Sequence, residues 1–196
     1  MVTTIDRHLL DDRVIVREST GWSSHGLTGN SVAVYSPCEK YRYMLTRCWD
    51  ASKPRHLVFV GLNPSTATEN VDDPTIRKLV GYANRWGLGG LTMLNFFAFR
   101  STDPKKLPAY YDDANGIEND GVLRMMFGSA AERGHVLAFG WGAHGGNHVR
   151  SLRSRMLTDM ALSVGAAPKC FGYTGNGQPK HPLYLKNDAQ LIYPCL

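Results

Sequence analysis

From residue 55 onward the sequence alternates between short apolar runs and longer helical patterns. Four runs are apolar on both faces and bounded by Gly or Pro, which is typical of strands inside a parallel sheet. They are residues 56–62, 91–99, 135–141 and 168–174. Helical spacing of apolar residues fills the gaps, at 74–87, 121–134 and 148–165. This alternation predicts an α/β fold, a three-layer α/β/α arrangement with a central four-stranded parallel sheet.

The third helical pattern combines an apolar stripe with a set of arginines. The stripe consists of Val149, Leu152, Met156 and Met160. Three arginines, Arg150, Arg153 and Arg155, fall mainly off that stripe. We expect them on a solvated face, with a phosphate-binding patch as the alternative.

Residues 1–54 have a different pattern and are predicted to form an N-terminal arm and hairpin. The first 30 or so residues are mixed and end in a Gly/Ser/His-rich stretch, which indicates a loop or a loosely attached arm. Two alternating segments follow, SVAVYSPC and YRYMLTRCW, with turn residues Pro37 and Glu39 between them. They predict a hairpin or edge strands attached to the 55–196 core, so we expect one α/β domain over residues 1–196.

Charge and cysteine content limit the partners and the compartment. The net charge is +5 with a sequence pI of about 9.1, which suits an anionic partner such as nucleic acid. The four cysteines show no Cys-x-x-Cys spacing, so we expect buried free thiols, no metal and no cofactor. No run of 18 apolar residues and no apolar signal core are present, which predicts a cytoplasmic monomer without a membrane span.

Each predicted strand of the core ends in an unusual polar or aromatic group. The first ends in Asn63, the second carries Asn95, and the third ends in Trp141-Gly142. The fourth leads into GNGQPKHPLYL, which contains His181. Ligands of open α/β sheets bind beyond the carboxyl ends of the strands, so we expect these four groups to line one site.

The order of these motifs resembles the uracil-DNA glycosylase superfamily. The resemblance covers about residues 56–186, and its motifs here are Gly61-Leu62-Asn63-Pro64, Leu94-Asn95, Trp141-Gly142 and His181-Pro182-Leu183. The asparagine in the first motif is most like the branch of mismatch-specific thymine and uracil glycosylases. The whole chain also resembles a bacterial and phage family of unknown function, through YRYxLxR, GLNPSTA, DDPTIR, NFFAFRSTDP and GxPxHPLYL.

The resemblance implies a role for each motif residue. Asn63 would hold the attacking water, although an amide cannot take its proton. Either the reaction needs no strong base, or a carboxylate of the same loop helps; Asp73 suits helix capping and catalysis equally, while Asp72 suits capping better. His181 would donate a hydrogen bond to the base oxygen as charge develops there.

The same resemblance implies a base pocket. Asn95 would read the pyrimidine edge through its amide, and Phe97 or its neighbour Phe96 would stack on the ring. Gly61, Ser65 and Trp141 complete the predicted base-binding set.

A DNA substrate also requires contacts outside the pocket, because the base must leave the duplex. Leu183 and Tyr184 form either the wedge that this needs or a short strand packed on the core. Phosphates would be bound by residues rich in hydroxyl, amide and ammonium donors. These are Ser101, Thr102, Lys105, Lys106, Gly145, Lys180 and Lys186.

Ser65 suggests which base is removed. Enzymes strict for uracil have a bulky tyrosine directly after the proline of the first motif, and that ring collides with groups at the 5-position. The small Ser65 leaves room there. We therefore predict a DNA glycosylase for a flipped, 5-substituted or otherwise modified pyrimidine, acting in repair or in defence against modified viral DNA. A non-catalytic reader of modified nucleic acid and a hydrolase of free nucleosides or nucleotides are the alternatives.

Overall fold

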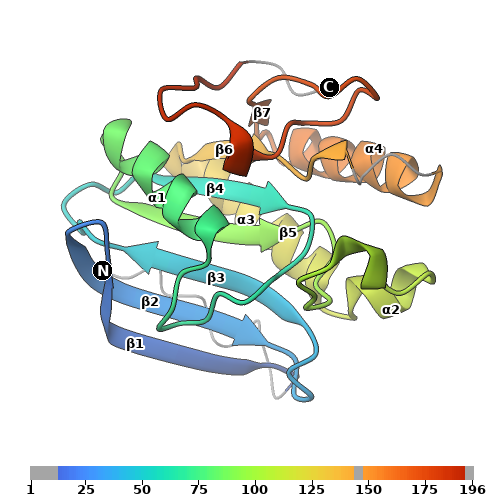
Figure 1. Ribbon diagram of the computed structural model, residues 1–196, viewed down its shortest axis with the longest axis horizontal. Coiled ribbons are helices and arrows are strands. Elements are labelled where there is room, and N and C mark those ends of the chain that lie inside the picture. Colours follow the sequence, from blue (N-terminus) through green and yellow to red (C-terminus); the bar gives the residue numbers. More distant parts are fainter. Residues whose placement is uncertain (1–12, 144–147, 193–196) are drawn as a thin grey trace.

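The computed structural model describes residues 13–143 and 148–192, and it is built around one mixed β-sheet (Figure 1). The sheet has seven strands in the order β1-β2-β3-β5-β4-β6-β7. Their bounds are β1 Ile15–Ser24, β2 Leu27–Tyr35, β3 Arg42–Cys48, β4 His56–Gly61, β5 Gly90–Asn95, β6 Val136–Phe139 and β7 Lys169–Cys170. The α/β class is thus confirmed.

The strands predicted from residue 55 onward form the parallel part of the sheet. β5, β4, β6 and β7 pair in parallel, while β3 joins the outer edge of β5 in an antiparallel ladder with Leu45 opposite Met93. These four strands are the predicted parallel set, and the N-terminal strands continue the same sheet to seven strands in all. The predicted strands were also too long, since β5 ends at Asn95 and β7 contains only Lys169–Cys170.

The N-terminal hairpin is present, and a strand that the sequence did not indicate precedes it. β2 and β3 pair as the predicted hairpin. β1, expected as a loop or arm, pairs antiparallel with β2 and buries Trp22, which is 1% exposed. β1 is an edge strand with one face largely in solvent, so its sequence is mostly polar and lacks a clear apolar run.

Helices cover both faces of the sheet. α1 (Pro74–Arg85) packs on the face that carries Phe59, and α3 (Asn119–Arg133) and α4 (His148–Ser163) pack on the opposite face, which carries Val60. The period of two along β4 explains how neighbouring residues enter separate cores. A short α2 (Tyr111–Asn115) lies near the carboxyl end of β5. Within the described residues, no helix is long and apolar enough to cross a membrane.

The buried face of α4 differs from the predicted stripe. Leu152 and Met156 are 50% and 47% exposed, whereas Arg153 is 1% exposed, so the solvated-face prediction is wrong for this arginine. Arg153 donates to the backbone oxygen of Phe96 at 2.9 Å and forms an ion pair with Asp120 at 2.7 Å. Arg153 is therefore part of a buried polar network. The spacing of apolar residues along the helix does not reveal these polar partners.

Three of the four cysteines lie in the described part of the chain. Cys170 is buried as expected, Cys48 is half-buried, and Cys38 is exposed in the β2–β3 turn, where the expectation is wrong. Cys195 lies outside the described residues.

Candidate functional site

A cavity of about 690 Å³ lies at the carboxyl ends of the parallel strands. Its wall combines the ends of β4, β5 and β6 with the loops that follow them and with the segment before the C-terminus. The lining residues are Arg42, Gly61 to Asn63, Ser65, Asp73 to Ile76, Met93, Ser101, Thr102, Pro104, Trp141 to Ala143, Thr174, Lys180, His181 and Leu183 to Leu185. Volumes of a few hundred to about 1,000 Å³ are typical of small-ligand sites.

The cavity brings together most of the residues that the sequence singled out. Asn63, Asp73 and His181 all line it, although up to 118 positions separate them along the chain. The same wall contains Gly61, Ser65, Ser101, Thr102, Trp141, Lys180, Leu183 and Tyr184. The expectation that the ends of β4 and β6 and the His181 segment share one site is therefore met by the geometry.

Asn63 is held in one orientation by backbone oxygens. Its Nδ2 donates to the oxygens of Ser101 at 2.8 Å, Pro64 at 3.0 Å and Phe99 at 3.5 Å. A further bond, from Ser101 N to Pro64 O at 2.9 Å, fixes the two loops to each other. With Nδ2 engaged, Oδ1 is the amide atom left to accept a hydrogen bond in the cavity.

Asp73 caps helix α1 and also lines the cavity. Its Oδ1 accepts from the backbone N–H of Ile76 at 2.8 Å, and the side chain is 8% exposed. The carboxylate lies at the helix N-terminus, where the backbone dipole stabilises negative charge. Oδ2 has no hydrogen-bond donor among the described residues. Asp73 can therefore cap α1 through Oδ1 and interact with a ligand in the cavity through Oδ2.

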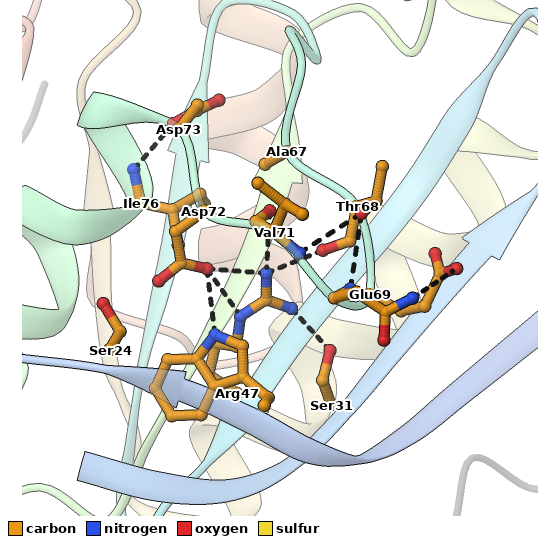
Figure 2. Close-up of polar contacts among 12 residues, drawn as sticks. Ser24, Ser31, Arg47, Ala67, Thr68, Glu69, Val71, Asp72, Asp73 and Ile76 are labelled. Atoms are coloured by element: carbon orange, nitrogen blue, oxygen red, sulfur yellow. Dashed lines mark hydrogen bonds and ion pairs between the residues drawn. The ribbon is translucent and has the colours of Figure 1, made fainter. Parts of the chain in front are cut away.

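Asp72, the neighbouring carboxylate, neither caps the helix nor lines the cavity. Its Oδ1 accepts from Nε and Nη2 of Arg47 at 2.9 and 2.7 Å and from Nε1 of Trp22 at 3.0 Å. Figure 2 shows Asp72 directed toward Arg47 and Asp73 directed toward α1. The expected capping role of Asp72 is wrong, because a buried arginine of β3 provides a stronger partner than the helix end.

Arg47 fixes the loop that carries the first motif to the N-terminal strands. Besides Asp72, its Nη2 donates to the backbone oxygen of Thr68 at 2.7 Å, and its Nη1 donates to Ser31 of β2 (Figure 2). The hairpin thus holds residues 62–73 against the sheet, which places Asn63 and Asp73 at the cavity.

His181 is positioned by close backbone packing. Gly142 N donates to the backbone oxygen of Pro179 at 2.8 Å, and Lys180 N donates to that of Gly172 at 2.9 Å. A Cβ on Gly142, whose φ is +77°, would lie 3.1 Å from the Cβ of His181. Glycine adopts this conformation without strain, and any larger residue would press its Cβ against the histidine.

The ring orientation of His181 follows from its own turn. Its Nδ1 accepts the N–H of Leu183 at 3.3 Å and caps the 3-10 turn Pro182–Tyr184. A neutral imidazole that accepts at Nδ1 carries its proton on Nε2. The turn also replaces the short strand that was the alternative for Leu183 and Tyr184, and it leaves Tyr184 88% exposed at the cavity.

Trp141 forms part of the cavity wall. It is 1% exposed, and its Nε1 donates to Oε1 of Gln178 at 2.8 Å. Its ring centroid lies 4.9 Å from that of Phe96. A rigid apolar wall with a satisfied N–H is suited to a flat ligand.

Two residues of the predicted base pocket do not line the cavity. Phe97 is 3% exposed and belongs to the core, where its ring packs against Tyr111. Its backbone N–H donates to the oxygen of Leu62 and so continues the β4–β5 ladder. Asn95 is fully buried, and neither atom of its side-chain amide has a partner among the described residues. Asn95 is therefore not part of the cavity wall, although Met93, two residues earlier on the same strand, is.

The predicted phosphate contacts divide into two sets. Ser101, Thr102 and Lys180 line the cavity. Lys105, Lys106 and Lys186 are exposed and do not line it, although each follows within two residues of a lining position. Gly145 lies outside the described residues.

Arg42 is a cavity residue that the sequence reasoning did not select. It is the first residue of β3 and 1% exposed; its Nη1 donates to the backbone oxygen of Ala67, and its Nε has no partner. Burial lowers the pKa of Arg42 to about 10, so the side chain stays charged at neutral pH. The sequence did contain a signal for this residue, because Arg42 is a charged residue at the start of a segment that predicts a strand.

Comparison with known proteins identifies a family. A family model described as "Protein of unknown function (DUF1643)" matches residues 42–183. The chain belongs to this family. The matched region begins at Arg42 and ends at Leu183, so it spans the cavity almost completely. No curated protein and no solved structure gives a significant match.

No metal centre is evident in the described part of this DUF1643 protein. Residues 13–143 and 148–192 contain no group of three or more His, Cys, Asp or Glu side chains placed to hold a metal ion. The polar groups on the cavity wall include the amide of Asn63, the carboxylate of Asp73, the imidazole of His181 and the guanidinium of Arg42.

Proposed function

We propose that this DUF1643 protein is a DNA glycosylase, which hydrolyses the N-glycosidic bond of a pyrimidine flipped into the cavity. The observation that carries the proposal is the convergence of Asn63, Asp73 and His181 on one cavity of about 690 Å³. The order of these motifs, which resembles the uracil-DNA glycosylase superfamily, supports it. A uracil-DNA glycosylase-like fold is part of the same proposal.

Asn63 and Asp73 act on the attacking water. Oδ1 of Asn63 accepts a hydrogen bond from the water, since Nδ2 is engaged with backbone oxygens. The water oxygen bonds to C1′ of the sugar, the C1′–base bond breaks, and its electron pair leaves with the base. The carboxylate of Asp73 takes the proton from the water and, while ionised, stabilises the cationic sugar.

His181 stabilises the departing base. Because Nδ1 accepts the N–H of Leu183, the neutral ring presents Nε2–H as a donor. Negative charge grows on the base oxygens as the glycosidic bond breaks. A fixed donor aimed at such a developing anion contributes roughly 3 kcal/mol to the lowering of the barrier.

Ser65 determines which bases enter. Its small side chain lines the cavity directly after the first motif. The proposal therefore extends to pyrimidines with a group at C5, whether from a mismatch or from modified viral DNA.

The exposed residues around the cavity provide the DNA contacts of the proposal. Tyr184 is 88% exposed beside the cavity and can occupy the gap left by a flipped base. Lys180 is exposed on the same wall, and Lys105, Lys106 and Lys186 extend the positive charge beyond it. Phosphate contacts of this kind make the affinity fall steeply with salt.

The proposal is tested by single-turnover excision from oligonucleotides with different pyrimidines, scored as alkali-labile abasic sites. Asp73→Asn is the decisive variant, because asparagine keeps the helix cap but cannot take a proton. We expect a loss of at least about 100-fold in rate with unchanged DNA binding. Asp73→Asn with wild-type activity would assign Asp73 to capping alone. DNA binding without product from any pyrimidine would contradict the glycosylase and favour a non-catalytic reader.

A further inference from the structure

Among the residues whose burial the structure describes, three arginines are almost completely buried, and one of them has no acidic partner within that part of the chain. Arg47 forms an ion pair with Asp72 at 2.7 Å, and Arg153 forms one with Asp120 at 2.7 Å. Arg42 is equally buried, but within residues 13–143 and 148–192 no carboxylate oxygen lies within 4.0 Å of its guanidinium. Buried charges in proteins are normally paired, so this difference requires an explanation.

The protein groups around Arg42 satisfy only part of its guanidinium. Nη1 donates to the backbone oxygen of Ala67, whereas Nε is buried without a partner. Asp73 is the carboxylate that acts on it electrostatically, but that side chain already caps α1 through Oδ1. A guanidinium presents five donors in a planar fork that suits carboxylate and phosphate oxygens, and most of that capacity is unused here.

The position of Arg42 shows where the missing partner comes from. Of the three buried arginines, Arg42 alone lines the cavity. The loop that it contacts through Ala67 also carries Ser65, two residues earlier and on the same cavity wall. Arg42 is buried on the cavity wall, whereas the lysines at and near the cavity are exposed.

We propose that Arg42 binds an anionic group, a carboxylate or a phosphate, on the ligand of this cavity. The inference rests on the proposed function for the nature of that ligand. In a DNA substrate the anionic group is a substituent of the base near Ser65. In a free nucleotide it is the monoester phosphate. In both cases the ligand supplies the charge that Asp72 and Asp120 supply to the other two arginines.

Two matched ligand pairs separate these sources. The first pair is an oligonucleotide with a 5-carboxyl pyrimidine and the same oligonucleotide with a 5-hydroxymethyl pyrimidine. The second pair is a free pyrimidine nucleoside monophosphate and its nucleoside. Binding is measured directly by calorimetry or fluorescence, independently of turnover. We expect wild-type protein to prefer the anionic member of one pair by at least about tenfold, since an Arg–carboxylate or Arg–phosphate bond is charge-assisted.

Substitutions at Arg42 test whether this side chain is responsible. Arg42→Met keeps the length and removes the charge, and Arg42→Lys keeps the charge without the planar fork. We expect Arg42→Met to lose the preference and Arg42→Lys to retain part of it. Arg47→Met is the structural control: it should lower the melting temperature strongly, because it leaves Asp72 without its partner. Arg42→Met should stay within a few degrees of wild type.

Equal affinity of the wild type for both members of each pair overturns the inference, and this comparison needs no variant. A preference that persists in Arg42→Met also overturns it, as does a loss of stability in Arg42→Met equal to that of Arg47→Met. The proposed function can fail separately: if no base is excised but the anionic preference depends on Arg42, the glycosylase is refuted and the Arg42 site stands.

Discussion

Asp72→Asn tests whether the first-motif loop is held in place by the N-terminal strands. Asp72 accepts two hydrogen bonds from Arg47 and one from Trp22, all at its Oδ1. The side chains of Arg47 and Asp72 are 0% and 5% exposed. Removal of one partner from a buried ion pair leaves the other charge uncompensated and costs about 3–5 kcal/mol. We therefore expect Asp72→Asn to lower the free energy of unfolding by about that amount.

The assay is urea unfolding of both proteins, with tryptophan fluorescence and circular dichroism as probes. For a chain of this size, 3–5 kcal/mol corresponds to a fall of roughly 6–20 °C in melting temperature. Asp73→Asn is the matched control, because it changes the adjacent carboxylate but keeps the cap, so a change below about 1 kcal/mol is expected. A stability loss below 1 kcal/mol for Asp72→Asn would show that the Arg47–Asp72 ion pair does not hold the first-motif loop in place.

Three further perturbations follow from the geometry. Ser65→Tyr should reduce excision of 5-substituted pyrimidines far more than excision of uracil; equal rates for both would remove Ser65 from base selection. Gly142→Ala should cost about 1–2 kcal/mol through its φ of +77° and also slow turnover by displacing His181. Its control is Gly177→Ala, which has a φ of +74° but open space around the added Cβ, and should affect stability only. Burial lowers the pKa of His135 to about 4. The unfolded chain therefore takes up this proton first, and stability should fall by up to about 2 kcal/mol between pH 6.5 and pH 4, a fall that His135→Gln should reduce in urea titrations.

The parallel part of the sheet was predictable because buried parallel strands leave a strong signal in sequence. β4 is buried throughout, apolar from Leu57 to Val60, and ends at Gly61, so both its position and the site beyond it follow from the pattern. β1 left no such signal, because an edge strand with a solvated face is mostly polar. β2 and β3, by contrast, were predictable as a hairpin because their apolar residues alternate with polar ones.

The candidate site was predictable where a residue lies directly at a strand end or in a constrained turn. Asn63 follows the end of β4 and His181 caps a tight turn, and both line the cavity as expected. Asn95 also lies at a strand end, the last position of β5, but it is buried and does not line the cavity, and sequence spacing does not encode which strand-end side chains reach the wall. The buried arginines Arg42 and Arg153 were missed because sequence patterns assign charged residues to solvent unless their partners are known.

The proposed glycosylase activity is tested most directly by measuring the release of a free base. Wild-type protein is incubated with duplex and single-stranded oligonucleotides that carry uracil, thymine or 5-substituted pyrimidines, and the products are analysed by mass spectrometry. We expect one intact pyrimidine released for each abasic site, with both products lost in Asp73→Asn and reduced in a His181→Ala variant. Oligonucleotides that bind to the protein but remain intact, for every pyrimidine offered, would contradict it.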